Sequence, residues 1–227
     1  MGREAVSRRP EPADEGGLRG RKKRETRDRL AHVATLMFIE RGFESVTIAE
    51  IADAAGVSKM TVSNYFPLKE DLVFDAYEGV VDSLARVVRE RRPGESVLHA
   101  LRRSFSASLN EQHPLNGRCT PGFARLVYDS PRLRAREREI DEQREAALAD
   151  ALAAASGARP DDPAPGLNAA QLAAVHRVLV RSVRELIRAG TREEAVRAHA
   201  AQLATAAFDS LEPVLGDHCI RADEPSA

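Results

Sequence analysis

The segment TIAEIADAAGVSKMTVSNYF, residues 47–66, decides the fold of the N-terminal part of the chain. Its pattern predicts two short helices on either side of a tight turn at Gly56. Thr47 and Glu50 have the spacing of a capping box at the start of the first helix, and Ser58 is a typical N-cap for the second. Four apolar residues are spaced to fill the core between the helices: Ile51, Val57, Val62 and Phe66. We therefore predict a helix-turn-helix, in which the second helix enters the major groove of DNA.

The predicted outer face of the second helix carries five polar side chains and one methionine. They are Lys59, Met60, Thr61, Ser63, Asn64 and Tyr65. Side chains of these types can donate to phosphates, hydrogen-bond to purine edges or contact a thymine methyl group. An alanine-rich helical hairpin alone is common. A glycine at the turn, a serine cap and a donor face together point specifically to DNA.

The rest of the chain also has a helical pattern, without strand-like alternation. A helix from about residue 22 to 41 precedes the segment, and one long helix from 68 to 92 follows it. Further helices are predicted at about 95–111, 123–128, 131–157, 168–189 and 191–215, the last capped by Thr191 and Glu194. The expected fold is all-α, with an N-terminal three-helix DNA-binding domain and a C-terminal helical bundle for ligand binding and dimerisation.

Composition and charge divide the chain into three parts. Residues 1–20 hold several prolines and glycines and few apolar side chains, so we expect a disordered basic arm. The helix-turn-helix domain should span 21–67 and the regulatory domain 68–227. The run RGRKKRETRDR, residues 19–29, has seven basic and two acidic residues. Such a cluster is typical of a nucleic-acid binder, and it also fits a solvated helix start.

Several classes of protein are disfavoured by what the sequence contains. Two cysteines 100 residues apart, Cys119 and Cys219, do not suit a disulfide framework or a zinc site. The first 25 residues contain no apolar core, so we expect no signal peptide, and no stretch approaches the ~18 apolar residues of a membrane span. The six histidines are scattered, and no phosphate-binding loop or nucleophile elbow occurs. We expect a cytoplasmic protein that is not an enzyme, with no cofactor, no metal and no membrane partner.

The stretch FIERGFESVTIAEIADAAGVSKMTVSNYFPLKEDLVFDAY, residues 38–77, resembles the TetR (tetracycline-repressor) family of bacterial transcription regulators. The resemblance extends over about 24–77. It implies a homodimer that binds a palindromic double-stranded DNA operator, usually as a repressor. We predict a two-state switch, in which a ligand in the bundle changes the separation of the two recognition helices so that it no longer matches about 34–36 Å on DNA, and operator affinity falls. We expect the helix over 68–92 to transmit that change.

The resemblance also implies roles for individual residues. Phosphate contacts are expected from Thr47, Ser58, Thr61, Tyr65 and Lys69, and base contacts from Lys59, Met60 and Asn64. Ser63 departs from the family, which usually has tyrosine there, so its contact is open. Alternatives remain: Ser58 as a cap only, Tyr65 packed beside Phe66, and Lys69 as a solvated helix start.

Two apolar stripes on the last two helices are consistent with the implied dimer. The predicted interface residues are Leu172, Val175, Leu179, Val183, Leu186, Val196, Leu203, Ala207 and Leu211. The alternative is that these stripes face only the internal core of one protomer.

The stretch FARLVYDSPRLRAREREIDEQREAALADALAAASG, residues 123–157, resembles the regulatory domain of a TetR subgroup with acyl-coenzyme-A-like ligands, including the mycofactocin-regulator type. This implies an apolar tunnel lined by Leu98, Leu101, Phe105, Leu109, Phe123, Leu126, Val127 and Val180, and a small apolar or acyl-coenzyme-A-like effector. These residues could equally be ordinary core. Two other functions stay open: a DNA-binding regulator without a small-molecule ligand, and a redox sensor that uses Cys119 beside Arg118.

Overall fold

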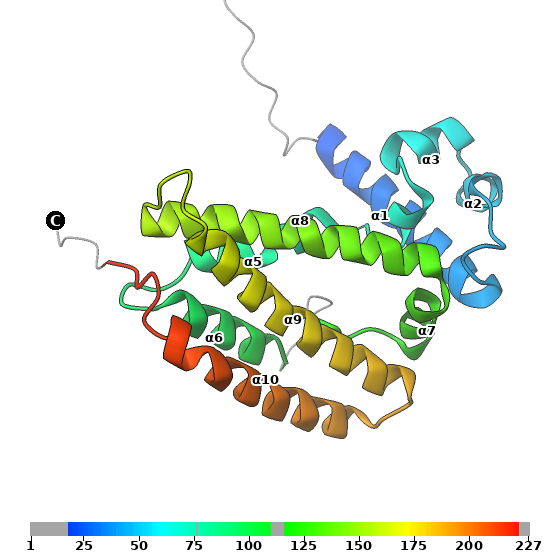
Figure 1. Ribbon diagram of the computed structural model, residues 1–227. Helices are drawn as coiled ribbons and strands as arrows, with labels where there is room; N and C mark the ends of the chain where they lie inside the picture. The colour runs from blue at the N-terminus through cyan, green and yellow to red at the C-terminus, as the bar shows by residue number, and fades with distance from the viewer. Residues whose placement is uncertain (1–17, 76, 110–115, 223–227) are drawn as a thin grey trace, which may run out of the picture.

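The computed structural model describes residues 18–75, 77–109 and 116–222, and within these ranges the chain is helical and has no strand (Figure 1). Three helices form an N-terminal head: α1 (Leu18–Arg41), α2 (Ile48–Ala55) and α3 (Lys59–Tyr65). Three short elements then lead to the regulatory bundle: η1 (Lys69–Leu72), α4 (Tyr77–Val81) and α5 (Ser83–Arg89). The bundle contains α6 (Val97–Leu109), α7 (Pro121–Asp129), α8 (Pro131–Ser156), α9 (Ala164–Arg188) and α10 (Glu193–Leu215).

The predicted all-α class is confirmed, and most helix ends coincide with predicted signals. Ser130 accepts a hydrogen bond from the backbone of Leu133 at the start of α8, where Pro131 occupies the first turn. Gly157 ends α8 in the left-handed conformation. Helix α1 begins at Leu18, inside the predicted arm, and residues 1–17 of that arm lie outside the described residues.

The single long helix predicted over 68–92 is wrong. The described part of this segment is a 3-10 turn followed by two short helices, α4 and α5. The carboxylate of Asp71 accepts hydrogen bonds from the backbone N–H of Leu68 and from Arg136 of α8. This long-range contact holds η1 in a tight turn against α8, and the helical pattern of the sequence does not reveal it.

The predicted cap at Thr191 is also wrong. Helix α10 has its N-cap one residue later, at Arg192, and makes no side-chain capping bond there. Gly190 takes a positive φ of 77°, and the N–H of Thr191 instead bonds to the carbonyl of Leu186. Thr191 therefore belongs to the tight turn that ends α9, and α10 begins one residue after the predicted position.

Buried apolar side chains form two separate cores. The larger lies in the regulatory bundle among α5, α6, α9, α10 and the second half of α8. The smaller holds the head together, and it also contains Leu126 and Val127 of α7 and Leu133 of α8. The head is therefore packed as one unit with the corner between α7 and α8, as their adjacent ribbons in Figure 1 show. None of the helices in the described ranges combines the length and the apolar character that crossing a bilayer requires.

Candidate nucleic-acid interface

The turn between α2 and α3 has the geometry that the sequence predicted. Gly56 lies in the left-handed region, with φ 66° and ψ 36°, and ends α2. Ser58 Oγ accepts a hydrogen bond of 3.0 Å from the N–H of Thr61 and caps α3. Ile51 and Val62 are fully buried between the helices. The angle between α2 and α3 is thus fixed by a cap, a turn and a small core.

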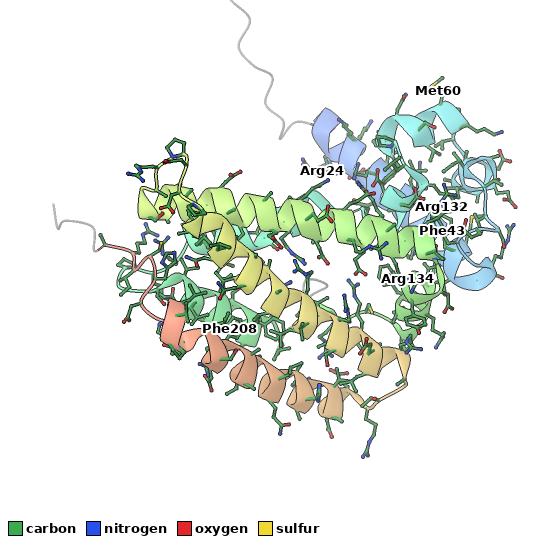
Figure 2. The ribbon with its side chains drawn as sticks, in the orientation of Figure 1. Arg24, Phe43, Met60, Arg132, Arg134 and Phe208 are labelled. Carbon is green, nitrogen blue, oxygen red and sulfur yellow. The ribbon has the colours of Figure 1, made fainter. Side chains whose placement is uncertain are left out.

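The outer face of α3 is open to solvent. Lys59, Ser63 and Asn64 are exposed, and Met60 is 69% exposed. Figure 2 shows Met60 at the outer edge of the head, pointing away from the rest of the molecule. The three residues predicted to face bases are therefore free to contact a duplex; their contacts stay a prediction.

The start of α2 carries a capping box that keeps Thr47 exposed. Thr47 Oγ1 accepts from the N–H of Glu50 at 3.3 Å, and Glu50 Oε2 accepts from the N–H of Thr47 at 2.8 Å. Arg41 donates to Glu50 at 2.6 Å. The hydrogen bond from Arg41, followed by those from Thr47, lowers the pKa of Glu50 to about 2. Glu50 therefore stays ionised at neutral pH. The Thr47 hydroxyl already donates to its carboxylate at 2.8 Å, so a phosphate contact from Thr47 stays a prediction.

Lys69 has a contact that its position in the sequence did not indicate. Its Nζ donates to the carbonyl oxygen of Phe43 at 2.5 Å and lies 4.3 Å from the centroid of the Phe43 ring. The side chain is half-buried, and burial lowers the pKa of Lys69. The ammonium group therefore ties η1 to the loop after α1, and a phosphate contact from Lys69 stays a prediction.

The remaining predicted phosphate ligands have structural roles as well. Ser58 is the N-cap of α3, and Thr61 shares a 2.9 Å hydrogen bond with its hydroxyl. Tyr65 is half-buried against the head core. The sequence left open that Ser58 only caps α3 and that Tyr65 only packs beside Phe66. Both structural roles are compatible with a hydroxyl group that also donates to a DNA phosphate.

Arg27 holds the end of α3 in position. The sequence pattern did not predict this role, and only the place of Arg27 in the basic run 19–29 drew attention to it. Its guanidinium donates to the carbonyl oxygen of Tyr65 at 2.9 Å and lies 4.5 Å from the centroid of the Phe66 ring. At the start of α1 the basic side chains Arg21, Lys22, Lys23 and Arg24 are exposed. Figure 2 places Arg24 on the first turns of α1, on the same side of the molecule as α3.

The prediction of one apolar tunnel is wrong, because its residues are divided between the two cores. Leu101 and Phe105 line a cavity of about 310 Å³ between α5, α6, α9 and α10, and Leu98 and Leu109 are buried in the same core. Phe123, Leu126 and Val127 pack instead against the head core. Val180 is half-buried, with its backbone beside Gly117. Helix α7 is amphipathic, and it turns its apolar face to the head rather than to the cavity.

The cavity has a mixed lining. Its apolar wall includes Leu101, Phe105, Leu172 and Phe208, and Figure 2 shows Phe208 where α10 lies beside α6. Ser83, Ser104, Ser108 and His176 supply polar groups. The charged residues of the lining are Arg86 and Arg103, of which Arg103 forms a two-fold hydrogen-bonded pair with Glu95 at 2.7 and 2.9 Å.

Much of the predicted dimer interface lies inside the protomer. Leu172, Leu179, Val183 and Val196 are buried in the regulatory core, so they cannot face a second chain. The other five predicted residues are partly buried and pack against that same core: Val175, Leu186, Leu203, Ala207 and Leu211. These five side chains keep part of their surface exposed, so a contribution from them to a dimer contact stays a prediction.

Cys119 lies in a partly buried position before α7. Burial raises the pKa of the Cys119 thiol, and the nearby charge of Arg184 only partly opposes this. A raised pKa reduces the thiolate fraction on which oxidation depends. In the part of the chain that the structure describes, no group of three or more His, Cys, Asp or Glu side chains could hold a metal ion.

A rigid head with an exposed donor face on its third helix, joined to an all-helical bundle with a cavity, defines the class of helix-turn-helix transcriptional regulators. The sequence profile for bacterial regulatory proteins of the tetR family matches residues 30–76. The regulator TcmR of Streptomyces glaucescens is 32% identical over 205 residues, which cover 88% of this chain and 88% of TcmR. The chain therefore belongs to the TetR family, and it is a DNA-binding transcriptional regulator.

Other relatives and solved structures agree with this assignment. The repressor KstR2 of Rhodococcus jostii is 37% identical over 82 residues, 36% of this chain and 38% of KstR2. The structure of a SmeT–triclosan complex has a TM-score of 0.55 at 18% identity and covers 89% of this chain and 99% of SmeT. That of Salmonella enterica GusR has a TM-score of 0.51 at 21% identity, covering 85% and 96%. The two structures show a shared fold, and the relatives indicate regulators rather than an enzyme family.

Proposed function

We propose that the protein represses transcription by binding a palindromic operator as a homodimer, and that a small effector in the regulatory bundle releases it. The exposed polar face of α3, held in place by Ile51 and Val62, carries this proposal. Repression is supported by the name of KstR2, a repressor. FasR of Mycolicibacterium smegmatis, which is 36% identical to this chain over 66 residues, is a transcriptional activator. The reporter experiment below therefore has to distinguish repression from activation.

The cavity between α5, α6, α9 and α10 supports the effector. Its volume of about 310 Å³ lies at the lower end of the range for small-molecule pockets. An acyl or small aromatic group fits this volume, whereas the coenzyme A part of a thioester would have to lie outside it. The solved structure of SmeT, which shares the fold, is that of a complex with triclosan.

Operator binding can be tested together with the effector class. An unbiased selection of duplexes by the full-length protein should yield a palindrome, and a reporter carrying it should be silenced by the protein. In a gel-shift titration, octanoyl-coenzyme A and octanoate should be compared for release of the operator. Selection of no palindrome would contradict the DNA-binding proposal, and release by neither compound would contradict the acyl-effector class.

Asn64→Ala should relax sequence preference while leaving non-specific binding intact. An amide that pairs with a base edge is worth about 1–3 kcal/mol of discrimination, so the loss should fall on one or two base pairs of each half-site. Fluorescence anisotropy against a panel of single-base operator variants measures it. Gln202→Ala, an exposed amide of α10, is the matched control and should change nothing. An equal loss on every duplex would assign Asn64 to a phosphate or to folding.

Val178→Glu should convert the dimer to a monomer. Val178 is 53% exposed on α9, and Leu167, 61% exposed, lies three turns earlier on the same side of the helix. These two exposed apolar side chains share the outer face of α9 with the exposed side chains of Gln171, Arg181 and Glu185, and we propose this mixed face as the centre of the dimer contact. Light scattering during gel filtration gives the mass. Leu36→Glu, at a 55% exposed position of α1, is the control and should stay dimeric. A dimeric Val178→Glu protein would place the interface elsewhere.

A further inference from the structure

Two ion pairs join α8 and α9 between the two cores. Glu145 of α8 pairs with Arg177 of α9 at 2.9 Å, and Glu137 pairs with Arg184. Helix α7 lies beside the start of α8 and the end of α9 (Figure 1). In the last two turns of α9, arginine side chains therefore make the contacts with α7 and α8.

Two guanidinium groups lie against the Tyr128 ring where α7, α8 and α9 meet, and a third arginine, Arg184, is one turn away on α9. Arg188 of α9 lies 4.0 Å from the centroid of the Tyr128 ring of α7, and Arg134 of α8 lies 6.0 Å from the same centroid. Figure 2 places Arg134 beside α7. Arg184, one turn before Arg188, reaches Glu137 and lies close enough to Cys119 to affect its pKa.

These arginines have fewer acceptors than their charge requires. The Nε atoms of Arg184 and Arg188 are shut off from solvent and make no hydrogen bond within the part of the chain that the structure describes. In those same ranges Glu137 is the one carboxylate that pairs with the group, and it pairs with Arg184. Burial lowers the pKa of Arg184, which reflects the cost of holding its charge there. A desolvated N–H group without an acceptor destabilises the protein, and a bound ligand that supplies an acceptor would remove this cost.

We propose that Arg184, Arg188 and Arg134 bind the anionic group of a ligand, a carboxylate or a phosphate. The planar guanidinium fork matches the oxygens of either group and is the side chain that proteins favour for this purpose. Tyr128 is 51% exposed, so the site opens to solvent along the edge of α7.

The site is placed to affect the head. Helix α7 and the first turns of α8 contribute Leu126, Val127 and Leu133 to the head core. An anion that links Arg188 to Arg134 would draw α9 and α8 together beside these residues. The regulatory role of this site rests on the proposed function, because the anion would be the polar group of the effector. Binding of the anion itself can be measured without DNA.

The test is the thermal unfolding of the full-length protein in sodium phosphate, compared with sodium chloride at equal ionic strength. Phosphate should raise Tm with saturation, and Arg188→Gln should raise the apparent Kd for phosphate at least tenfold. In chloride Arg188→Gln should keep or raise Tm, because it removes a half-buried charge that has no carboxylate partner in the described structure. A merely structural arginine would instead lower Tm in both salts. Arg197→Gln, on the exposed face of α10, is the matched control and should respond as the parent does.

Octanoate and octanol distinguish the sources of the anion. Stabilisation by octanoate and by phosphate, both lost in Arg188→Gln, supports a general anion site, and stabilisation by octanoate alone supports the carboxylate of an apolar effector. Arg134→Gln, an exposed position, provides a second variant that should lose the same response. No anion-specific rise in Tm, an equal rise with octanol, or an unchanged response in both variants would overturn the proposal. None of these results bears on operator binding, which the selection experiment tests separately.

Discussion

Phe38→Ala should lower the free energy of unfolding by about 3–5 kcal/mol, the range for deleting a buried phenyl ring from a core that cannot collapse around the gap. Phe38 is fully buried on α1 and lies 5.0 Å from Phe43, measured between ring centroids. A cavity of about 320 Å³ already lies beside these rings, at the contact of α1 with α7. The enlarged space would have few side chains free to fill it.

The same substitution should abolish operator binding at temperatures where the regulatory bundle is still helical. The head core that holds α3 is the core that loses the ring, and the larger core of the bundle is separate. Urea unfolding followed by circular dichroism gives the free energy, and hydrogen exchange of α3 amides shows where protection is lost. Leu36→Ala, two residues away and exposed, should change stability by less than about 0.5 kcal/mol. Loss of protection spread evenly over α6 and α10 would contradict two separate cores.

The parts of the fold that the sequence predicted correctly depend on short-range interactions. The capping box of Thr47 and Glu50, the left-handed Gly56 and the cap at Ser58 each involve residues within four positions of one another. Signals of this kind are present in the sequence whatever the rest of the chain does. The helix ends of the head, and with them its exposed α3 face, were therefore predictable from local patterns alone.

The errors arise where distant segments decide between two locally acceptable structures. The segment 68–92 has a helical pattern, but its start is a 3-10 turn whose Asp71 is bound by Arg136, 65 residues away, and no local signal reveals that contact. An apolar stripe on α9 shows that Leu172 and Leu179 are buried, but not whether α10 or a second protomer covers them. The residues of the predicted tunnel are all buried or half-buried, yet the pattern of α7 could not show which of two cores its apolar face meets.

Asp71→Ala should lower the free energy of unfolding by about 3 kcal/mol, the lower end of the range for removing one partner of a buried ion pair. Asp71 and Arg136 are 9% and 12% exposed, and Asp71 Oδ1 accepts from Arg136 at 3.0 Å from Nε and 2.8 Å from Nη2. Arg136 keeps Glu139 at 2.9 Å in the variant, which limits the loss. The substitution also removes the acceptor of the Leu68 N–H, so η1 should loosen beside the end of α3.

A double-mutant cycle separates the ion pair from the packing around it. Replacing both partners with apolar side chains, Asp71→Leu with Arg136→Met, should restore much of the stability, because no charge is then left buried without its partner. Asp82→Ala tests an exposed pair, since Asp82 and Arg89 are 47% and 52% exposed, and it should cost less than about 1 kcal/mol. If the double variant is stable but no longer releases its operator with effector, Asp71 and Arg136 transmit the signal from α8 to the head. If it is stable and fully inducible, the pair serves folding alone, and the coupling must run through the apolar contact of Leu126, Val127 and Leu133 with the head.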